Sequence, residues 1–361
     1  MMTITKDGQP VYDITLADSF HALSDFLGVY DPSGQKKYGI VSDSKVASFY
    51  LDAIFSIVSE HTKNVIKFVF PEGEENKKLE TVEQLYTTLI ENRFNRNDCL
   101  IALGGGVTGD LTGFAAATFL RGIDFIQVPT SLLAAVDSSI GGKTGVDFSA
   151  YKNMVGAFHM PKFVLINTAC METLDKRQFV SGMGEVVKSA LIKDKAFFEW
   201  LLDNREAVDK RDKDALSYMI TASDLVKKNV VETDPYETKG ERALLNFGHT
   251  LGHALEKYMD FSFMHGECVL IGSLFATELS CRKGLLSRAD ADRVIQYIQT
   301  FPLPEIPKDA DLEKIVSYTR NDKKATADGV RFILLSEIGN AVISRDVTEE
   351  DMCNVFHDYL K

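Results

Sequence analysis

The sequence lacks paired cysteines and long apolar runs. Its five cysteines, at positions 99, 170, 268, 281 and 353, are scattered and include no Cys-x-x-Cys pair. This placement does not form a disulfide framework, so we expect a reduced, cytoplasmic protein. The longest apolar stretch, residues 268–276, is far shorter than the roughly 20 residues that a membrane helix needs. The first residues, which include Lys6 and Asp7, lack the apolar run of a signal peptide.

An excess of positive charge is also missing. The chain carries 52 acidic and 40 basic residues, a formal net charge of -12, which repels polyanions at long range. General nucleic-acid binding is therefore excluded. A small phosphorylated substrate remains compatible if lysines and arginines gather in one pocket. The 45% apolar and 25% charged residues are ordinary for a globular protein.

The length and the hydrophobic patterning indicate two domains, because 361 residues exceed the ~250–300 at which single cores stop growing. Short β-branched runs at 39–42, 65–70, 99–103, 125–128 and 163–166 alternate with helical periodicity at 45–61 and 79–92. This alternation predicts a parallel sheet wrapped by helices. Beyond residue 172 we expect helices over 177–191, 195–204, 212–231, 244–258 and 266–283 and a late strand at 330–335. We predict an α/β domain over residues 1–172 and a mainly α-helical domain over 173–361.

A glycine-rich segment follows the predicted strand at 99–103. Gly104, Gly106 and Gly109 satisfy G-x-G-x-x-G between a strand and a helix, the context in which backbone N–H groups bind a pyrophosphate. An ordinary tight turn is the alternative, since glycine adopts positive φ easily. Asp110 suits a ribose or another polar group of a dinucleotide, or a helix cap.

A second glycine-rich segment, residues 136–145, superficially resembles a P-loop. Asp137 stands where that motif requires glycine, so we exclude an NTPase. What remains is a loop that carries Lys143, followed by Lys152 and Asn153. These donors suit an anion or a polyol, and solvated surface lysines are the alternative.

Three of the seven histidines lie within seventeen residues. His249 and His253 are four apart in a predicted helix, so they share one face, and His265 follows near the next helix. That spacing suits two metal ligands, or one ligand and one acid–base group. Glu185 lies among small and apolar residues and is the best candidate for a carboxylate ligand. The alternatives are a simple Glu185–Lys188 pair and satisfied, partly buried histidines.

Taken together, these motifs occur in one order along almost the whole chain. They are Gly73-Glu74 with Lys77, 104–110, Arg121-Gly122, 128–133, 136–147, 152–156, 181–188, 244–253 and 265–267. In these blocks the chain resembles the 3-dehydroquinate synthase family of sugar phosphate cyclases. The resemblance implies a Rossmann-like N-terminal domain that binds NAD, a helical C-terminal domain that binds Zn²⁺ or Co²⁺, and an active site between them.

The resemblance also implies roles for residues that match the family's motifs. The metal ligands would be Glu185, His249 and His265, with His253 as a proton-transfer group. NAD would contact Asp43, Glu74, Lys77, Gly105, Gly106, Val107, Asp110, Thr130, Ser131, Lys143, Lys152 and Thr173. The substrate would contact Asp137, Lys143, Asn153, Lys188, Lys227, Arg242, Asn246, one or both of Lys323 and Lys324, and Arg121 from a second subunit of a homodimer.

Some positions depart from the family's pattern. Lys45 stands where asparagine is frequent near the adenosine, and Tyr151 stands where glycine usually precedes the Lys-Asn pair. One extra residue between Asp234 and Arg242 makes either Lys227 or Lys228 the substrate-binding lysine. We favour Lys227.

The activity implied is conversion of 3-deoxy-D-arabino-heptulosonate 7-phosphate to 3-dehydroquinate and phosphate, a step of the shikimate pathway and so of aromatic amino acid biosynthesis. It proceeds by transient oxidation with NAD, phosphate elimination, re-reduction and intramolecular aldol closure. The enzyme would be a carbon–oxygen lyase. The alternatives are another sugar phosphate cyclase, a metal-dependent polyol dehydrogenase, and a non-catalytic regulator that retains the fold. The phosphate-binding lysines and arginines argue against the dehydrogenase.

Overall fold

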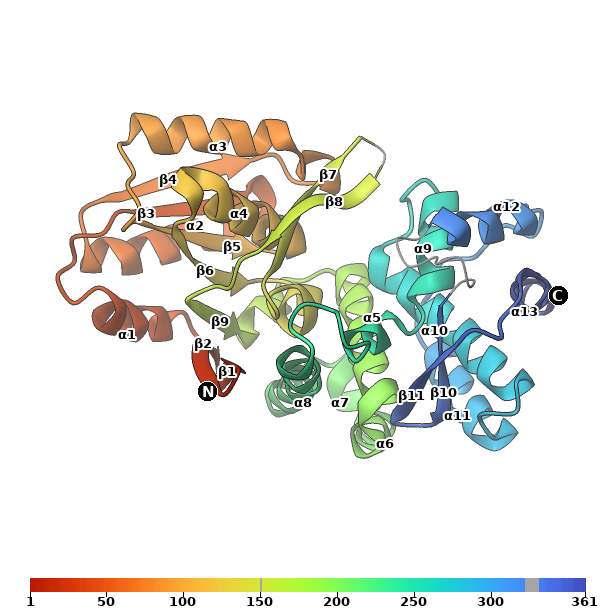
Figure 1. The fold of residues 1–361 in the computed structure, drawn as a ribbon. Coiled ribbons are helices and arrows are strands. Elements are labelled where there is room, and N and C mark those ends of the chain that lie inside the picture. The colour runs from red at the N-terminus through yellow and green to blue at the C-terminus, as the bar shows by residue number, and fades with distance from the viewer. Residues whose placement is uncertain (150, 322–330) are drawn as a thin grey trace. The chain divides into compact units, whose positions relative to one another are not determined.

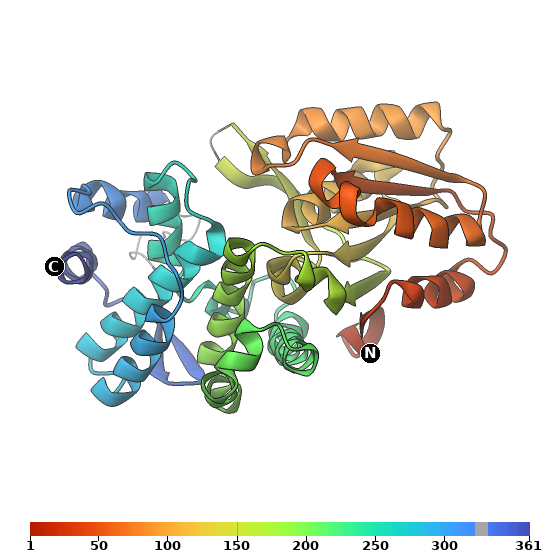
Figure 2. The same ribbon diagram turned by 180° about the vertical axis from the view of Figure 1, so that it is seen from behind.

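The structure is a computed structural model that describes residues 1–149, 151–321 and 331–361. The chain divides into two compact units, Met1–Leu174 and Asp175–Lys361. Their elements can be followed in Figure 1 and from behind in Figure 2. The boundary predicted after residue 172 lies just before this division. Among the described residues, no helix is both long and apolar enough to cross a membrane.

The first unit is built on a seven-stranded sheet with the order β1-β2-β9-β6-β5-β3-β4. Strand β1 is antiparallel to β2, and the other neighbouring strands are parallel. The strands are β1 (Met2–Lys6), β2 (Gln9–Ala17), β3 (Tyr38–Asp43), β4 (Val65–Phe70), β5 (Cys99–Gly104), β6 (Asp124–Pro129), β7 (Lys143–Phe148), β8 (Tyr151–Phe158) and β9 (Phe163–Asn167). The helices are α1 (His21–Tyr30), α2 (Ser44–His61), α3 (Leu79–Glu91) and α4 (Gly106–Thr118), with short turns η1 (Glu74–Asn76), η2 (Phe119–Arg121), η3 (Ala134–Ser138) and η4 (Thr168–Glu172).

Helices cover both faces of this sheet because successive strand residues point to opposite sides. Ile40 of β3 packs with α1 and α2, and the next residue, Val41, packs with α3 and α4. Both faces of the sheet are therefore apolar, which explains why the sequences of these strands are continuous hydrophobic runs. The predicted parallel sheet wrapped by helices is confirmed.

The antiparallel hairpin β7–β8 lies outside the main sheet and packs against α4. We predicted a loop around Lys143, but Lys143 begins β7. The reason is a buried face: Val146, Val155 and Ala157 join the apolar cluster beneath α4. A P-loop lysine is followed by a helix, so the strand here agrees with the exclusion of an NTPase.

The second unit is mainly helical, as predicted. Its helices are α5 (Lys176–Lys193), α6 (Lys195–Asp203), α7 (Arg205–Asp209), α8 (Lys213–Thr233), α9 (His249–Tyr258), α10 (His265–Arg282), α11 (Arg288–Gln299), α12 (Leu312–Ser317) and α13 (Glu349–Tyr359), with 3₁₀ turns η5 (Arg242–Asn246) and η6 (Tyr318–Asn321). Strands β10 (Phe332–Glu337) and β11 (Asn340–Ser344) form a two-stranded sheet. The late strand thus extends two residues past the predicted end at 335.

The predicted helix over 244–258 is wrong at its start. Residues Arg242–Asn246 form the separate turn η5, and α9 begins at His249. Between them Gly248 adopts φ 77°, where a Cβ atom would lie 2.4 Å from Ser273 Oγ and 2.8 Å from Val269 O of α10. The close approach of α10 therefore fixes the helix start, and hydrophobic periodicity does not report such an approach.

Candidate metal and cofactor sites

One carboxylate oxygen and two imidazole nitrogens converge in the second unit. Oε1 of Glu185 lies 3.5 Å from Nε2 of His249 and 3.3 Å from Nε2 of His265. Two ligand atoms bound tetrahedrally to one Zn²⁺ at ~2.05 Å are about 3.3 Å apart. This oxygen is buried and makes no hydrogen bond of good geometry within the described residues. A buried acceptor of this kind fits a divalent metal ion.

Glycine contacts between helices bring these three side chains together. A Cβ atom on Gly266 would lie 1.7 Å from Ser181 O, and one on Gly184 would lie 2.4 Å from Gly266 O. The start of α10, with His265, can therefore lie directly on α5, with Glu185. A Cβ atom on Gly272 would lie 1.9 Å from Gly248 O. Helix α10 therefore also lies directly on the backbone at the start of α9, one residue before His249.

His253 lies on the same face of α9 as His249. Ligand atoms of His249, His253 and His265 lie within 4.8 Å of one another. The His253 side chain is exposed, whereas those of His249 and His265 are only 12% and 33% exposed. Its exposure places His253 at the solvent side of the cluster, where a proton can be exchanged with water.

Lys188 satisfies the other oxygen of Glu185. Its ammonium group pairs with Oε2, which leaves Oε1 directed at the histidines. Burial alone raises the pKa of Glu185, but the Lys188 charge and the neighbouring imidazoles lower it well below its usual range. Glu185 is therefore a carboxylate, and the Glu185–Lys188 pair considered from the sequence coexists with a metal-binding role.

The imidazoles of His249 and His265 differ in their electrostatic surroundings. Burial keeps the pKa of His249 well below its usual value, so this ring is neutral, as a metal ligand must be. Burial also lowers the pKa of His265, but the nearby carboxylates of Glu185 and Glu256 outweigh it and raise that pKa to about 10. Two carboxylates flanking one imidazole create a site for a cation, which is a proton or a metal ion.

Other predicted substrate residues of this unit are buried cations. Lys188, Lys227 and Arg242 are between 2% and 6% exposed, whereas Lys228 forms an ion pair with Glu232 on the surface of α8. The preference for Lys227 over Lys228 as the substrate-binding lysine stays a prediction. Asn246 lies with Arg242 in η5 and not on the helix of His249, which corrects the predicted helix over 244–258. Lys323 and Lys324 lie outside the described residues.

A buried aspartate organises the loop that leads to Arg242. Oδ1 of Asp234 accepts hydrogen bonds from the N–H groups of Thr238 and Lys239, at 2.7 and 3.1 Å. Oδ2 accepts from the N–H of Arg242 at 3.2 Å. The Arg242 guanidinium in turn donates to Pro235 O at 2.7 Å. Sequence reasoning did not single out Asp234.

In the first unit, predicted NAD contacts gather where the parallel strands end. Asp43 ends β3 and caps α2, Gly105 follows β5 and precedes α4, and Thr130 follows β6. Cβ atoms on Gly105 and Gly106 would lie 3.4 Å from Ser131 Oγ and 3.2 Å from Ser138 Oγ. Ligands of open α/β sheets bind at this edge, and the N-terminus of α4 favours a phosphate. Val107 lies in the first turn of α4.

A buried lysine connects several of the predicted residues. Nζ of Lys77 donates to Asp110 Oδ2 and to Asn153 Oδ1, both at 2.6 Å. Glu74 Oε1 lies 4.0 Å from Lys77 Nζ and 3.8 Å from Lys152 Nζ. Burial alone lowers the pKa of Lys77, but Asp110 and Glu74 raise it above its usual value. The structure thus brings together Glu74, Lys77, Asp110, Lys152 and Asn153.

The remaining predicted residues of the first unit lie in turns or at element ends. Asp137 is in the π-helical turn η3 and Lys143 begins β7. Thr173 follows η4, where its hydroxyl is 2.5 Å from that of Tyr50. Arg121 is exposed in a turn where Leu120 and Arg121 have φ of 52° and 69°.

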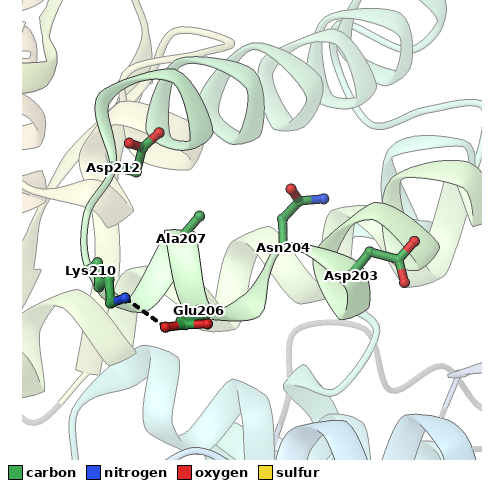
Figure 3. Close-up of a pocket in the computed structure, with 6 residues that line it drawn as sticks. All are labelled: Asp203, Asn204, Glu206, Ala207, Lys210 and Asp212. Atoms are coloured by element: carbon green, nitrogen blue, oxygen red, sulfur yellow. Dashed lines mark hydrogen bonds and ion pairs between the residues drawn. The ribbon is translucent and has the colours of Figure 1, made fainter.

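Figure 3 shows a surface depression in the second unit. Its lining is formed by Asp203, Asn204, Glu206, Ala207, Lys210 and Asp212. Lys210 Nζ is paired with Glu206 Oε1 at 2.6 Å, so the acidic groups dominate. This surface repels a phosphorylated substrate and contains none of the predicted site residues.

Sequence reasoning missed two further carboxylates beside the predicted residues. Oε2 of Glu256 lies 3.6 Å from His265 Nδ1, and Oδ1 of Asp147 accepts a hydrogen bond from the Asn153 N–H at 2.7 Å. A signal existed for Glu256, because it lies seven residues after His249 and so on the same helix face. For Asp147 we find no such signal, since its role depends on the hairpin.

Comparison with known proteins agrees with the family that the motifs suggest. The profile of the 3-dehydroquinate synthase N-terminal domain matches residues 67–181, and that of the C-terminal domain matches residues 182–325. The chain is 43% identical over 345 residues to the 3-dehydroquinate synthase of Shewanella pealeana, covering 95% of both chains. It is 44% identical to that of Nitrosospira multiformis, covering 88% of this chain and 87% of the relative.

Solved structures with the same architecture include two sugar phosphate cyclases. A 2-deoxy-scyllo-inosose synthase with carbaglucose-6-phosphate, NAD⁺ and Co²⁺ has a TM-score of 0.89 and 27% identity, covering 99% of both chains. ValA, a 2-epi-5-epi-valiolone synthase from Streptomyces hygroscopicus with NAD⁺ and Zn²⁺, has a TM-score of 0.87 and 26% identity, covering 100% and 99%. The matching domain profiles and relatives define a phosphate-eliminating cyclase. The chain belongs to the 3-dehydroquinate synthase family.

Proposed function

We propose that the chain converts 3-deoxy-D-arabino-heptulosonate 7-phosphate to 3-dehydroquinate and phosphate. Family membership supports this activity. The structural observation that carries the proposal is the convergence of Glu185 Oε1 with the Nε2 atoms of His249 and His265, at 3.5 and 3.3 Å. Such a set of three protein ligands leaves a position open for substrate.

NAD and a divalent metal ion are the cofactors of the proposed reaction. When bound, NAD accepts and returns a hydride, and the metal stabilises negative charge that develops on a substrate oxygen. Glu185, His249 and His265 hold the metal. The edge of the sheet formed by Asp43, Gly105 and Thr130 holds the dinucleotide, with its pyrophosphate at the start of α4.

Buried cations bind the acidic substrate against the net charge of the chain. Lys188, Lys227 and Arg242 each lie nearly buried in the second unit, and Lys143, Lys152 and Asn153 are in the hairpin of the first. Charge-assisted hydrogen bonds from such groups to phosphate and carboxylate oxygens offset the cost of gathering like charges. Asp137 and Asn246 supply polar contacts to the hydroxyl groups.

His253 transfers protons in this proposal. It shares a helix face with His249 and is exposed to solvent, so it can pass a proton between a substrate hydroxyl near the metal and water. Glu185 and the buried histidines cannot do so while they act as ligands.

We further propose a cytoplasmic homodimer. All five cysteines have free thiols, as expected in a reducing compartment. Arg121 is exposed on a left-handed turn held by a hydrogen bond from Arg96 Nε to Leu120 O at 3.0 Å. In this position its guanidinium reaches outward and is available to the phosphate site of a second subunit.

A panel of phosphorylated sugars tests the substrate assignment. Purified enzyme with NAD and Zn²⁺ is incubated with the heptulosonate 7-phosphate or with glucose 6-phosphate, and released phosphate and the carbocyclic product are measured. We expect turnover of the heptulosonate alone. Turnover of glucose 6-phosphate alone would instead indicate an activity like that of 2-deoxy-scyllo-inosose synthase, whose structure with a glucose phosphate analogue is similar to this one.

A further inference from the structure

The imidazole of His265 lies between two carboxylates. Its Nε2 atom is 3.3 Å from Glu185 Oε1, and its Nδ1 atom is 3.6 Å from Glu256 Oε2. The Glu256 side chain is 4% exposed. A carboxylate with so little access to water is costly unless a cation or a donor compensates it, and an imidazole Nδ1–H is such a donor.

Glu256 reaches His265 because of its place in α9. Residues 249, 253 and 256 follow the four- and seven-residue spacing of one helix face, and this face lies against the start of α10. The glycine contact between Gly252 and Cys268 O, where a Cβ atom would lie at 2.7 Å, keeps the two helices close. Glu256 therefore meets His265 from the side opposite to Glu185.

We infer that Glu256 is a positioning residue of the metal site, which accepts the Nδ1–H of His265 and so directs its Nε2 lone pair toward Glu185 and His249. This inference rests on the proposed metal site. A neutral imidazole carries one N–H, and the hydrogen bond made by that nitrogen determines which nitrogen binds the metal. The same contact makes the ring a stronger ligand.

Glu256 does not itself belong to the ligand set. The proposed ligand Glu185 Oε1 faces the Nε2 atoms of His249 and His265. Glu256 faces the opposite nitrogen of one ring. Its substitution is therefore expected to weaken metal binding without removing a ligand.

Titration of the metal-free full chain with Co²⁺, followed by visible absorption, tests the inference. We expect E256Q, which retains a neutral acceptor, to bind Co²⁺ about 10- to 100-fold more weakly than the wild type. E256D keeps the buried charge but withdraws it from Nδ1, and we expect it to weaken binding as well. At saturating Co²⁺ both spectra should be shifted, because the basicity of one ligand has changed.

Thr277→Val is the matched control. Thr277 is a fully buried polar residue of α10, three turns beyond His265, whose hydroxyl donates to Ser273 O at 2.7 Å. Its loss should lower thermal stability and leave the Co²⁺ affinity and spectrum unchanged. The inference is overturned if E256Q and E256D match the wild type in both affinity and saturated spectrum while E185Q loses Co²⁺. Absence of Co²⁺ binding by the wild type would reject the proposed metal site itself.

Discussion

At the scale of single residues, the proposed roles of the three clustered histidines differ with their exposure. The side chains of His249 and His265 lie against Glu185 and are 12% and 33% exposed, whereas His253 is exposed on the same helix face as His249. A ring that lies against a buried carboxylate suits a ligand, and an exposed ring suits proton exchange.

Replacement of His253 with alanine should therefore leave the metal in place. We expect a stoichiometric zinc content by atomic absorption and a loss of turnover of about 10²- to 10⁴-fold, the usual contribution of a general acid or base. H249A serves as the comparison and should lose the metal. Loss of zinc from H253A would show that His253 is a ligand.

We expect the Asp234 carboxylate to make a pH-dependent contribution to the stability of the folded protein. Burial alone raises the pKa of its carboxyl, but hydrogen bonds from the N–H groups of Lys239, Arg242 and Thr238 lower it below the ordinary 3.8. The pKa of Asp234 is therefore lower in the folded than in the unfolded protein. Its charge stabilises the fold at pH values above the unfolded-state pKa, and this stabilisation is lost as the pH falls through the folded-state pKa.

Asp234→Asn should accordingly destabilise the protein by about 1–3 kcal/mol at pH 7, because hydrogen bonds to a charged acceptor are lost. In thermal unfolding, the difference from the wild type should shrink below about pH 4. Asp212→Asn is a control, since Asp212 caps α8 through Asp214 and Ala215 N–H groups and asparagine caps equally well. A stability difference between D234N and the wild type that stays constant down to low pH would contradict this account.

At the scale of elements, the proposed metal site depends on how closely α5, α9 and α10 approach one another. The contact is made by backbone atoms at Gly184, Gly266 and Gly272, where added Cβ atoms would lie between 1.7 and 2.4 Å from backbone oxygens. Only glycine allows these distances. The same glycines therefore permit the close packing of the helices and the convergence of the proposed metal ligands.

Gly266→Ala should separate α5 from α10, and thereby Glu185 from His265. We expect a loss of stability of about 3 kcal/mol or more, since rigid backbone must move, together with a reduced zinc content. Gly28→Ala in α1 is the matched control, because nothing lies within 4 Å of its added Cβ, and it should be neutral or stabilising by up to ~1 kcal/mol. A G266A protein with normal zinc content would contradict the role of this contact.

Elements with a strong local signal were predictable from the sequence. Strands β3 to β6 and helices α2, α5 and α8 were located because their periodicity is strong and their caps are local. The start of α9 and the β7–β8 hairpin were not, because each depends on packing against a segment distant in sequence: α10 for Gly248, and α4 for Val146 and Val155.

The candidate site shows the same limit. Glu185 and the three histidines were identified from residue type and spacing, and the structure places them together. Glu256 was overlooked although its spacing from His249 indicated the same helix face, because its importance comes from its contact with His265 Nδ1. Asp234 carried no such signal, since its importance comes from the N–H groups that it meets in space, including that of Arg242.

At the scale of the whole molecule, the proposed homodimer predicts complementation between inactive variants. R121A would impair the phosphate site of the other subunit, and H253A impairs its own site. A mixed dimer would then contain one site with both groups intact. Mixing the two variants under conditions of subunit exchange should restore activity on the order of a quarter of the wild type. No recovery despite demonstrated exchange would place Arg121 in its own subunit's site.

The most direct test of the proposed function follows phosphate release and absorbance of NADH in one reaction with enzyme, NAD, Zn²⁺ and the heptulosonate 7-phosphate. We predict that phosphate is released over many turnovers without accumulation of NADH, and that a chelator abolishes the release. Steady accumulation of NADH, or phosphate release that persists in full after removal of the metal, would contradict a metal-dependent cyclase that regenerates its own cofactor.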